Sequence, residues 1–108
     1  YTGTHDNETI AGWWKSITAK ERKLARDYLC DSCTPDKDLY KCFISLVMRS
    51  SAKLCVIPMQ DYMGLDNSSR MNQPSTLGKN WKWRLTSGQF TEELQKNILE
   101  LTGRYGRL

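Results

Sequence analysis

The sequence predicts a mainly α-helical chain with at most a little β structure, and three observations lead to this prediction. Three segments place apolar residues three and four positions apart, which is the spacing of one helix face. Thr18 and Glu21 form the Thr-x-x-Glu pattern of a capping box, which marks the start of a helix. Only one short run, residues 54–59, is continuously apolar in the manner of a strand buried on both faces.

Two helices are expected in the first third of the chain. Asn7 can cap a helix over residues 8–17, because its side chain accepts hydrogen bonds from the free amides of a first turn. The capping box then starts a second helix, Ala19–Leu29. The apolar residues that share one face of this second helix are Leu24, Ala25, Tyr28 and Leu29.

Two further helices are expected after it. Pro35 suits the first turn of a third helix, which ends near Ser50. The buried stripe of this helix is predicted to be Leu39, Cys42, Phe43, Leu46 and Val47. A last helix covers residues 91–102, and Gly103 and Gly106 end it. Its inward residues are Leu94, Ile98 and Leu101.

The apolar run at residues 54–59 predicts a strand that Pro58 closes, since proline cannot donate to a ladder. A parallel-type strand needs neighbours on both edges, and this chain offers none. The chain also opens without an initiator Met, inside the polar run of residues 1–7. We therefore expect a segment of a longer protein, with little sheet of its own and exposed apolar surface.

The composition is that of a globular unit, taken here as a single segment over residues 1–108. Hydrophobic residues make up 39% and charged residues 26% of the chain. No apolar stretch approaches the roughly 20 residues of a membrane span, so no membrane partner is predicted. The net charge of +4 comes with mixed signs around Lys20 and Arg26, which is typical of a solvated helix face. Nucleic acid is therefore not a predicted partner.

The four cysteines predict no metal site. Cys30 and Cys33 have the spacing of a zinc pair, but no second pair and no nearby histidine completes the set. Reduced thiols in the cytoplasm are the default for such a chain, and no cofactor is predicted. A small zinc-stabilised module is kept as an alternative.

Polar residues gather at two junctions between predicted elements. His5, Asp6 and Asn7 combine a ring, a carboxylate and an amide just before the first helix, where a carboxylate can also be a plain cap. Gln60 and Asp61 directly follow the predicted strand, and ligand groups in α/β folds gather at the carboxyl ends of strands.

The polar segment over residues 64–88 is a third candidate, because a loop of this length inside a compact unit is usually functional. It carries Arg70, Asn72, Trp81 and Trp83. Indole faces beside polar hydrogen-bonding groups suit sugars, whose apolar CH faces stack while their hydroxyls are hydrogen-bonded. Alternatively, the two tryptophans simply fill core.

Together, these segments resemble the 4-α-glucanotransferase (amylomaltase) family. Residues 1–14 are similar to its THDN…GWW signature, residues 56–65 to its IPxQDxxGL segment, and residues 70–84 to its RMNxPG…NWxWR segment. The motifs stand in the family's order and span nearly the whole chain. Ser75 stands where the family usually has glycine, so a turn with positive φ at this position would be strained.

The resemblance implies a (β/α)8 TIM barrel of which this chain is the C-terminal part, from the end of strand seven to the final helix. Residues 53–59 would be the eighth strand. It also implies a retaining transfer of α-1,4-glucan between malto-oligosaccharides. The nucleophilic Asp and the acid/base Glu of the family lie on earlier strands, so this segment alone is expected to be inactive. An independent carbohydrate- or nucleic-acid-binding module is the alternative.

By the same resemblance, Asp6 is a third catalytic carboxylate that holds hydroxyls of the cleaved ring and favours its distorted transition state. His5 would contact the same sugar, and Asn72 would line the sugar site. Further residues expected to support substrate binding are Gln60, Asp61, Arg70 and Trp83. Alternatively, Asp61 and Arg70 pair with each other and hold the long loop. The implied partners are malto-oligosaccharides and the rest of the barrel.

Overall fold

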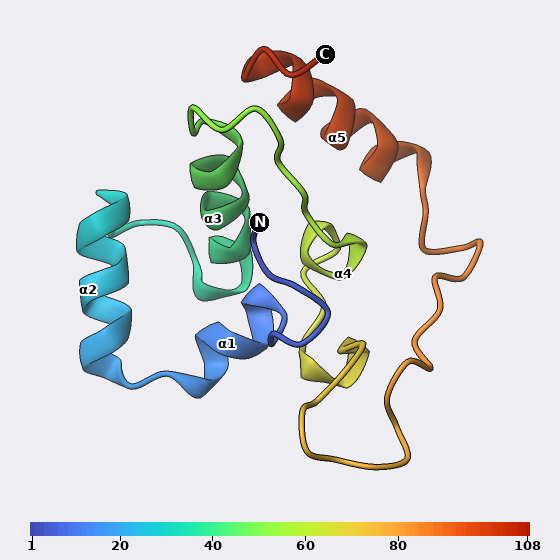
Figure 1. Cartoon of the computed structure of the whole chain (residues 1–108). Helices are drawn as coiled ribbons and strands as arrows, with labels where there is room; N and C mark the ends of the chain where they lie inside the picture. The colour runs from blue at the N-terminus through green and yellow to red at the C-terminus, as the bar shows by residue number, and fades with distance from the viewer.

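The computed structural model describes all 108 residues as helices and connecting segments, with no β-strand. The α-helices are α1 (Ile10–Ser16), α2 (Ala19–Leu29), α3 (Leu39–Met48), α4 (Met59–Tyr62) and α5 (Glu92–Arg104). Two short 3-10 helices, η1 (Asp36–Asp38) and η2 (Asn67–Ser69), precede α3 and follow α4. In Figure 1, α3 stands near the centre, while α2 and α5 lie on opposite sides of the molecule.

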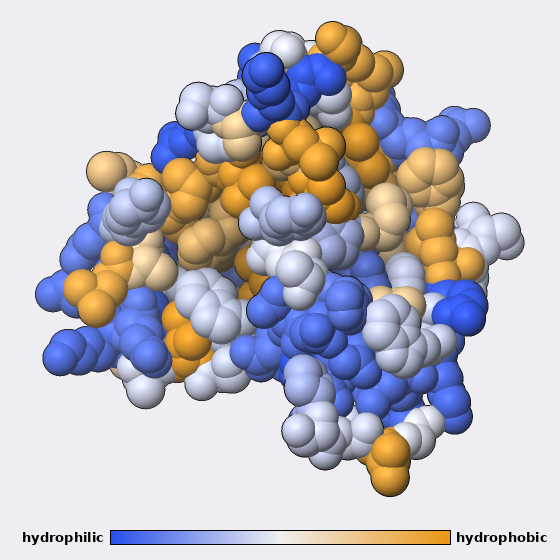
Figure 2. All heavy atoms as spheres, in the orientation of Figure 1, coloured by the Kyte–Doolittle hydropathy of each residue, from blue (hydrophilic) through white to orange (hydrophobic).

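The arrangement is more open than that of a typical domain of this length. Its radius of gyration is 14.5 Å, against about 13 Å for a compact chain of this size. The innermost packing joins Ile10 of α1 to Ile44 and Met48 of α3. Figure 2 shows apolar side chains at the surface over the upper part of the molecule, around α3 and α5. No helix combines the length and the apolar character that crossing a membrane requires.

Helix α1 begins two residues later than predicted, and its cap is Thr9. The Thr9 hydroxyl accepts a hydrogen bond from the Gly12 amide at 3.1 Å. Asn7, the predicted cap, is engaged elsewhere, because its side-chain oxygen accepts from the amide of Thr4 at 2.7 Å and from the Thr4 hydroxyl at 3.0 Å. This local turn ends before the helix starts, and so the prediction of Asn7 as the cap was wrong.

Helix α2 has the predicted bounds, and its capping box is present. The Glu21 carboxylate accepts from the Thr18 amide at 2.7 Å, and the Thr18 hydroxyl accepts from the Glu21 amide at 3.3 Å. Its apolar residues do not pack together, since the exposed fractions of Leu24 and Tyr28 are 60% and 74%. Arginines hold the helix instead: Arg22 donates to the Trp14 carbonyl at 3.0 Å.

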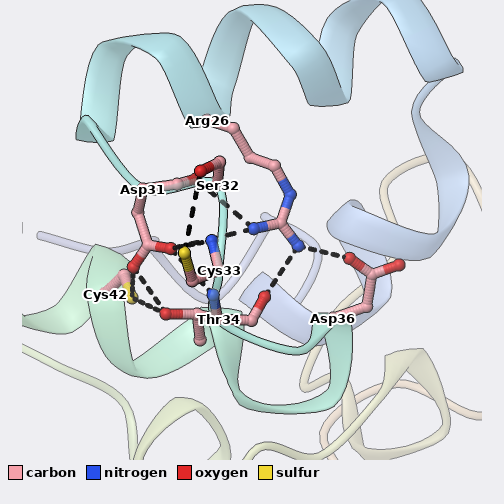
Figure 3. Close-up of polar contacts among 7 residues, drawn as sticks. All are labelled: Arg26, Asp31, Ser32, Cys33, Thr34, Asp36 and Cys42. Carbon is pink, nitrogen blue, oxygen red and sulfur yellow. Dashed lines mark hydrogen bonds and ion pairs between the residues drawn. The ribbon is translucent and has the colours of Figure 1, made fainter.

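The loop after α2 is organised around Asp31 (Figure 3). Its carboxylate accepts from the Thr34 hydroxyl at 2.5 Å and from the Thr34 amide at 2.9 Å, while the thiol of Cys42 on α3 lies 3.5 Å away. Arg26 reaches across the loop to the Thr34 carbonyl at 2.9 Å and to Asp36 at 2.7 Å. These contacts connect α2 to the start of α3.

All four cysteines are free thiols. No group of three or more histidine, cysteine, aspartate or glutamate side chains is placed to hold a metal ion.

The third predicted helix is realised as η1 followed by α3, with Pro35 just ahead of η1. Of the predicted stripe, Leu39 is fully buried, whereas Cys42, Phe43, Leu46 and Val47 are only partly buried. Ile44 and Met48 are buried in their place. The stripe is displaced because α1 and α4 pack on α3 from the side that carries Ile44.

The predicted strand at residues 54–59 does not form, and this prediction was wrong for the chain itself. Residues 54–57 are extended, but their one recorded backbone hydrogen bond joins the Val56 carbonyl to the Thr2 amide at 3.4 Å. No second strand is present to complete a ladder. Cys55 and Ile57 pack on the core while Leu54 and Val56 are exposed, and Pro58 begins α4.

The last predicted helix is confirmed in α5, which Thr91 caps by accepting from the Leu94 amide at 3.1 Å. It continues through Gly103 to Arg104, two residues past the predicted end. Arg107 then ties the terminus to the end of α3, because its guanidinium donates to the Met48 carbonyl at 2.7 Å. The inward residues Leu94, Ile98 and Leu101 are partly buried and line a groove of about 720 Å³ between α5 and α3.

The loop network predicts an acid-sensitive contribution to stability. Hydrogen bonds from the Thr34 hydroxyl and amide, with a further one from the Cys33 amide, lower the pKa of Asp31 from 3.8 to about 2. A carboxyl whose pKa is lower in the folded state stabilises the fold above its unfolded pKa, and this stabilisation is lost as the carboxyl is protonated. We expect Asp31→Asn to unfold at lower urea concentration than wild type at pH 7, with the gap closing between pH 4 and pH 2.

Asp27→Asn is the matched control, because Asp27 is an exposed carboxylate on α2 with no recorded hydrogen bond or ion pair. Its urea midpoint should follow wild type throughout. A gap between Asp31→Asn and wild type that stayed constant from pH 7 to pH 2 would contradict this role for Asp31.

Candidate functional site

The N-terminal segment that carries His5 and Asp6 is held at both ends by one buried carboxylate. Asp61 of α4 is 2% exposed. One of its oxygens accepts from the Thr2 hydroxyl at 2.6 Å, and the other accepts from the Ile10 amide at 2.8 Å. The Ile10 amide belongs to the first turn of α1, where amides lack helical partners and the dipole favours a negative charge. Asp61 therefore fixes where the segment starts and where it enters α1.

Asp6 lies in the turn between these two anchors, and its carboxylate is held while remaining accessible. The side chain is 48% exposed. One oxygen accepts from the Asn72 side-chain amide at 2.6 Å, and the other lies 3.2 Å from the His5 ring nitrogen Nε2. A hydrogen-bonded carboxylate with free lone pairs is suited to accept further hydrogen bonds from hydroxyl groups.

His5 contacts the long loop through its ring and through its backbone carbonyl. Its ring centroid lies 5.0 Å from that of Trp81, with the planes tilted by 37°. Its backbone carbonyl accepts from the Asn72 amide at 3.1 Å. The structure thus brings together three of the predicted site residues, namely His5, Asp6 and Asn72.

Arg70 joins the same group through the backbone. Its guanidinium donates to the Asp6 carbonyl at 2.8 Å, and its Nε is buried without a recorded partner. The alternative prediction that Arg70 pairs with Asp61 is not realised, since Asp61 is occupied by Thr2 and Ile10. Arg70 holds the turn that presents Asp6.

Gln60 and Trp83 lie outside these contacts. Gln60 is 7% exposed and donates to the Ser69 carbonyl at 3.3 Å, which connects α4 to the end of η2. Trp83 is partly buried, has no recorded ring contact, and its carbonyl accepts from Arg84 at 2.8 Å. Their roles as sugar ligands, like that of Asp61, stay predictions.

Trp81 was not among the residues that the sequence predicted to bind substrate, although it lies beside His5. Trp81 and Trp83 stand two positions apart among similar neighbours, so nothing in the local sequence separates them. The distinction comes from the path of the loop, which closes on itself through a hydrogen bond from the Trp81 amide to the Met71 carbonyl. This closure places Trp81 beside Asn72.

The closed loop, residues 71–81, carries backbone strain. Ser75 and Trp81 both have φ of 63°, a left-handed conformation that is uncommon outside glycine. Ser75, which stands where the family usually has glycine, therefore has the positive φ for which strain was expected. Asn80 stabilises the loop from inside by accepting from the Gln73 amide at 2.9 Å and donating to the Thr76 carbonyl at 3.0 Å.

A cavity of about 640 Å³ lies against this group of residues. His5, Asp6 and Arg70 line it, together with Gln60 and Asp61. Its volume falls within the range of small-molecule sites, about 300–1,000 Å³. Most of the residues that line it have polar side chains, and their carboxylate and amide groups can hydrogen-bond hydroxyl groups of a ligand.

The sequence is similar to those of known proteins over almost its whole length. A family model described as 4-alpha-glucanotransferase matches residues 1–91. The chain is a member of this family. It is 40% identical over 111 residues to the chloroplastic/amyloplastic 4-alpha-glucanotransferase of Arabidopsis thaliana, covering 100% of this chain and 19% of that protein. It is 42% identical over 108 residues to the 4-alpha-glucanotransferase of Clostridium butyricum, covering 99% and 22%.

A solved structure extends this relationship to three dimensions. The amylomaltase from Streptococcus agalactiae in complex with acarbose superposes with a TM-score of 0.90 at 32% identity, covering 99% of this chain and 21% of that one. The chain thus spans about a fifth of the length of the family members it matches. Its helical arrangement is that of the corresponding region of this amylomaltase.

The anchoring role of Asp61 predicts a large loss of stability on truncation. Asp61→Ala leaves the Thr2 hydroxyl and the Ile10 amide without an acceptor. Each buried donor left without a partner costs about 1–3 kcal/mol. Because the Thr2 hydroxyl is only partly buried, its loss costs less than that of the Ile10 amide. We therefore expect the free energy of unfolding, measured by urea denaturation followed by circular dichroism, to fall by about 2–4 kcal/mol.

A double-mutant cycle with Thr2→Val isolates the contact. Because Thr2→Val already removes one donor, the double variant should be more stable than the sum of the two single changes predicts. Additive losses would mean that Asp61 and Thr2 do not interact in solution.

Proposed function

We propose that this chain is part of a 4-alpha-glucanotransferase that moves α-1,4-glucan segments between malto-oligosaccharides by a retaining double displacement. Family membership supports the reaction class. The observation that carries the proposal to this site is the Asp6 carboxylate, which is accessible at a polar cavity and held on both oxygens by Asn72 and His5.

In this proposal Asp6 stabilises the transition state and forms no covalent bond. Glycosyl transfer with retention passes through an oxocarbenium-like, distorted sugar ring, and hydrogen bonds to ring hydroxyls that strengthen in that state contribute several kcal/mol. A carboxylate pre-oriented by neighbouring donors pays little reorganisation cost when it binds those hydroxyls. His5 contacts the same sugar, and Asn72 both lines the site and orients Asp6.

The nucleophile and the acid/base come from the rest of the protein. A retaining mechanism needs two carboxyl groups about 5–5.5 Å apart across the scissile bond. The cavity here also has Glu8 and Asp61, but these accept hydrogen bonds from Asn67, Thr2 and Ile10. The 108-residue chain by itself is accordingly inactive in this proposal.

The chain takes the place from the end of strand seven to the final helix of a (β/α)8 barrel. Residues 53–59 take the place of the eighth strand in this proposal. Within them Cys55 and Ile57 already pack on the core, and the segment pairs as a strand once neighbouring strands are supplied. The acarbose bound to the structural relative supports a carbohydrate ligand. We place the protein in the cytoplasm, although plant relatives are named for the plastid.

The direct test uses the full-length protein that contains this segment. We expect it to convert maltotriose to glucose and longer malto-oligosaccharides, measured by chromatography of the products. Asp6→Asn keeps the shape of the side chain but removes the charge, and it should lower kcat by about 10²–10³-fold, the scale of losing one pre-oriented transition-state contact.

Asp27→Asn serves as the control, since it removes an exposed carboxylate from α2 and should transfer glucan at the wild-type rate. Full activity in Asp6→Asn would remove Asp6 from the catalytic machinery. Transfer catalysed by the 108-residue chain alone would contradict the proposed source of the nucleophile and the acid/base.

A further inference from the structure

The loop over residues 71–81 places the indole of Trp81 beside His5, a contact that the proposed reaction does not by itself require. We propose that Trp81 is a positioning residue for the Asp6 carboxylate and that it acts through the His5 ring. This inference rests on the proposed function, because it assigns a role at the same site.

The backbone of Trp81 is the first observation. Its φ of 63° lies in the left-handed region, where a bulky residue is an outlier. Such a conformation costs on the order of 1–3 kcal/mol and persists only where its surroundings impose it. Gly78, three residues earlier in the same loop, adopts φ of 102° without any side chain. Glycine would adopt this backbone conformation at position 81 with less strain. The indole must therefore make a contact that offsets the strain.

The environment of the indole is the second observation. Trp13 and Trp14 pack on Phe43 in the interior, with ring centroids 5.4 and 6.3 Å from it. Trp81, in contrast, is 51% exposed, and its recorded ring contact is with His5. Filling core does not explain it, so the contact with His5 is what the strained backbone maintains.

The position of His5 connects this contact to the carboxylate. His5 belongs to an exposed turn, and its side chain is 55% exposed, so little besides Trp81 restrains the ring. Nε2 of the same ring lies 3.2 Å from one oxygen of Asp6. Asn72 holds the other oxygen at 2.6 Å.

Asn72 and Trp81 come from the two ends of one closed loop, which Met71 and Trp81 join. The loop therefore holds Asp6 twice, directly through Asn72 and indirectly through Trp81 and His5. Loss of the indole would leave one carboxylate oxygen without a fixed neighbour. The turn and the cavity would remain, because Asp61 and Arg70 hold them independently.

The contact can be tested by NMR in the full-length protein, where the ring signals of His5 are identified as those absent from His5→Gln. In wild type, the indole ring current should shift the His5 ring protons away from their values in the unfolded chain. Trp81→Asn should return them toward those values, since asparagine tolerates the left-handed backbone but has no ring. Trp81→Phe should keep part of the shift, and Leu77→Asn, at a fully exposed site in the same loop, should keep all of it.

The role is tested in the full-length protein by the split between kcat and KM. Misplacing a catalytic group by a small distance costs up to about 10²-fold in rate. We expect Trp81→Asn to lower kcat by about 10–10²-fold with KM little changed, because transition-state contacts are lost and ground-state binding is not. Trp81→Phe should recover most of the loss, and Leu77→Asn should match wild type.

Unmoved His5 signals in Trp81→Asn would overturn the inference, and so would a raised KM at unchanged kcat. The second would make Trp81 a direct stacking platform for sugar. An inactive full-length wild type would refute the proposed function, whereas an active wild type matched by Trp81→Asn would refute only the positioning role.

Discussion

The buried carboxylate of Asp61 is the constraint on which the site depends. It accepts from Thr2 and from the first amide of α1, and so it sets both ends of the turn that displays Asp6. A carboxylate that is 2% exposed requires such donors to offset the loss of water. Asp61 lies on α4, which directly follows the segment whose Cys55 and Ile57 pack on the core. Its two hydrogen bonds therefore also fix the turn relative to the core.

A second layer of contacts fixes the orientation of Asp6 within that turn. Arg70 holds the backbone of Asp6, and Asn72 holds its side chain. Both donors come from the segment after η2. They stand 64 and 66 residues after Asp6 in the sequence. The site is therefore built by folding the polar loop onto the N-terminal turn, with the helices acting as supports beneath it.

The outer helices are held by polar contacts more than by burial. Arginines attach α2 through Trp14 and Asp36, while Leu24 and Tyr28 stay exposed. Leu54 is likewise 72% exposed on an extended segment with free backbone groups. An unpaired edge with apolar side chains is normally covered by another element. The exposure of this edge is consistent with a chain that spans about a fifth of the length of its relatives.

Local interactions made the helix starts predictable from the sequence. The capping box at Thr18 and the cap at Thr91 depend only on residues within one turn, so their patterns sufficed. The cap of α1 was missed because Thr4 competes for the Asn7 side chain. The strand predicted at residues 54–59 does not form because a ladder requires a partner that this chain does not contain.

The sequence by itself determined the family, the capping box of α2 and the position of α5, because each of these depends on residues that are neighbours in the chain. Only the tertiary structure decided that Asp61 is an anchor and that Trp81 is the tryptophan beside His5. These outcomes depend on the route of a closed loop and on contacts across more than 50 residues. No local pattern encodes them, since the hydrogen-bonding partners meet only once the chain has folded.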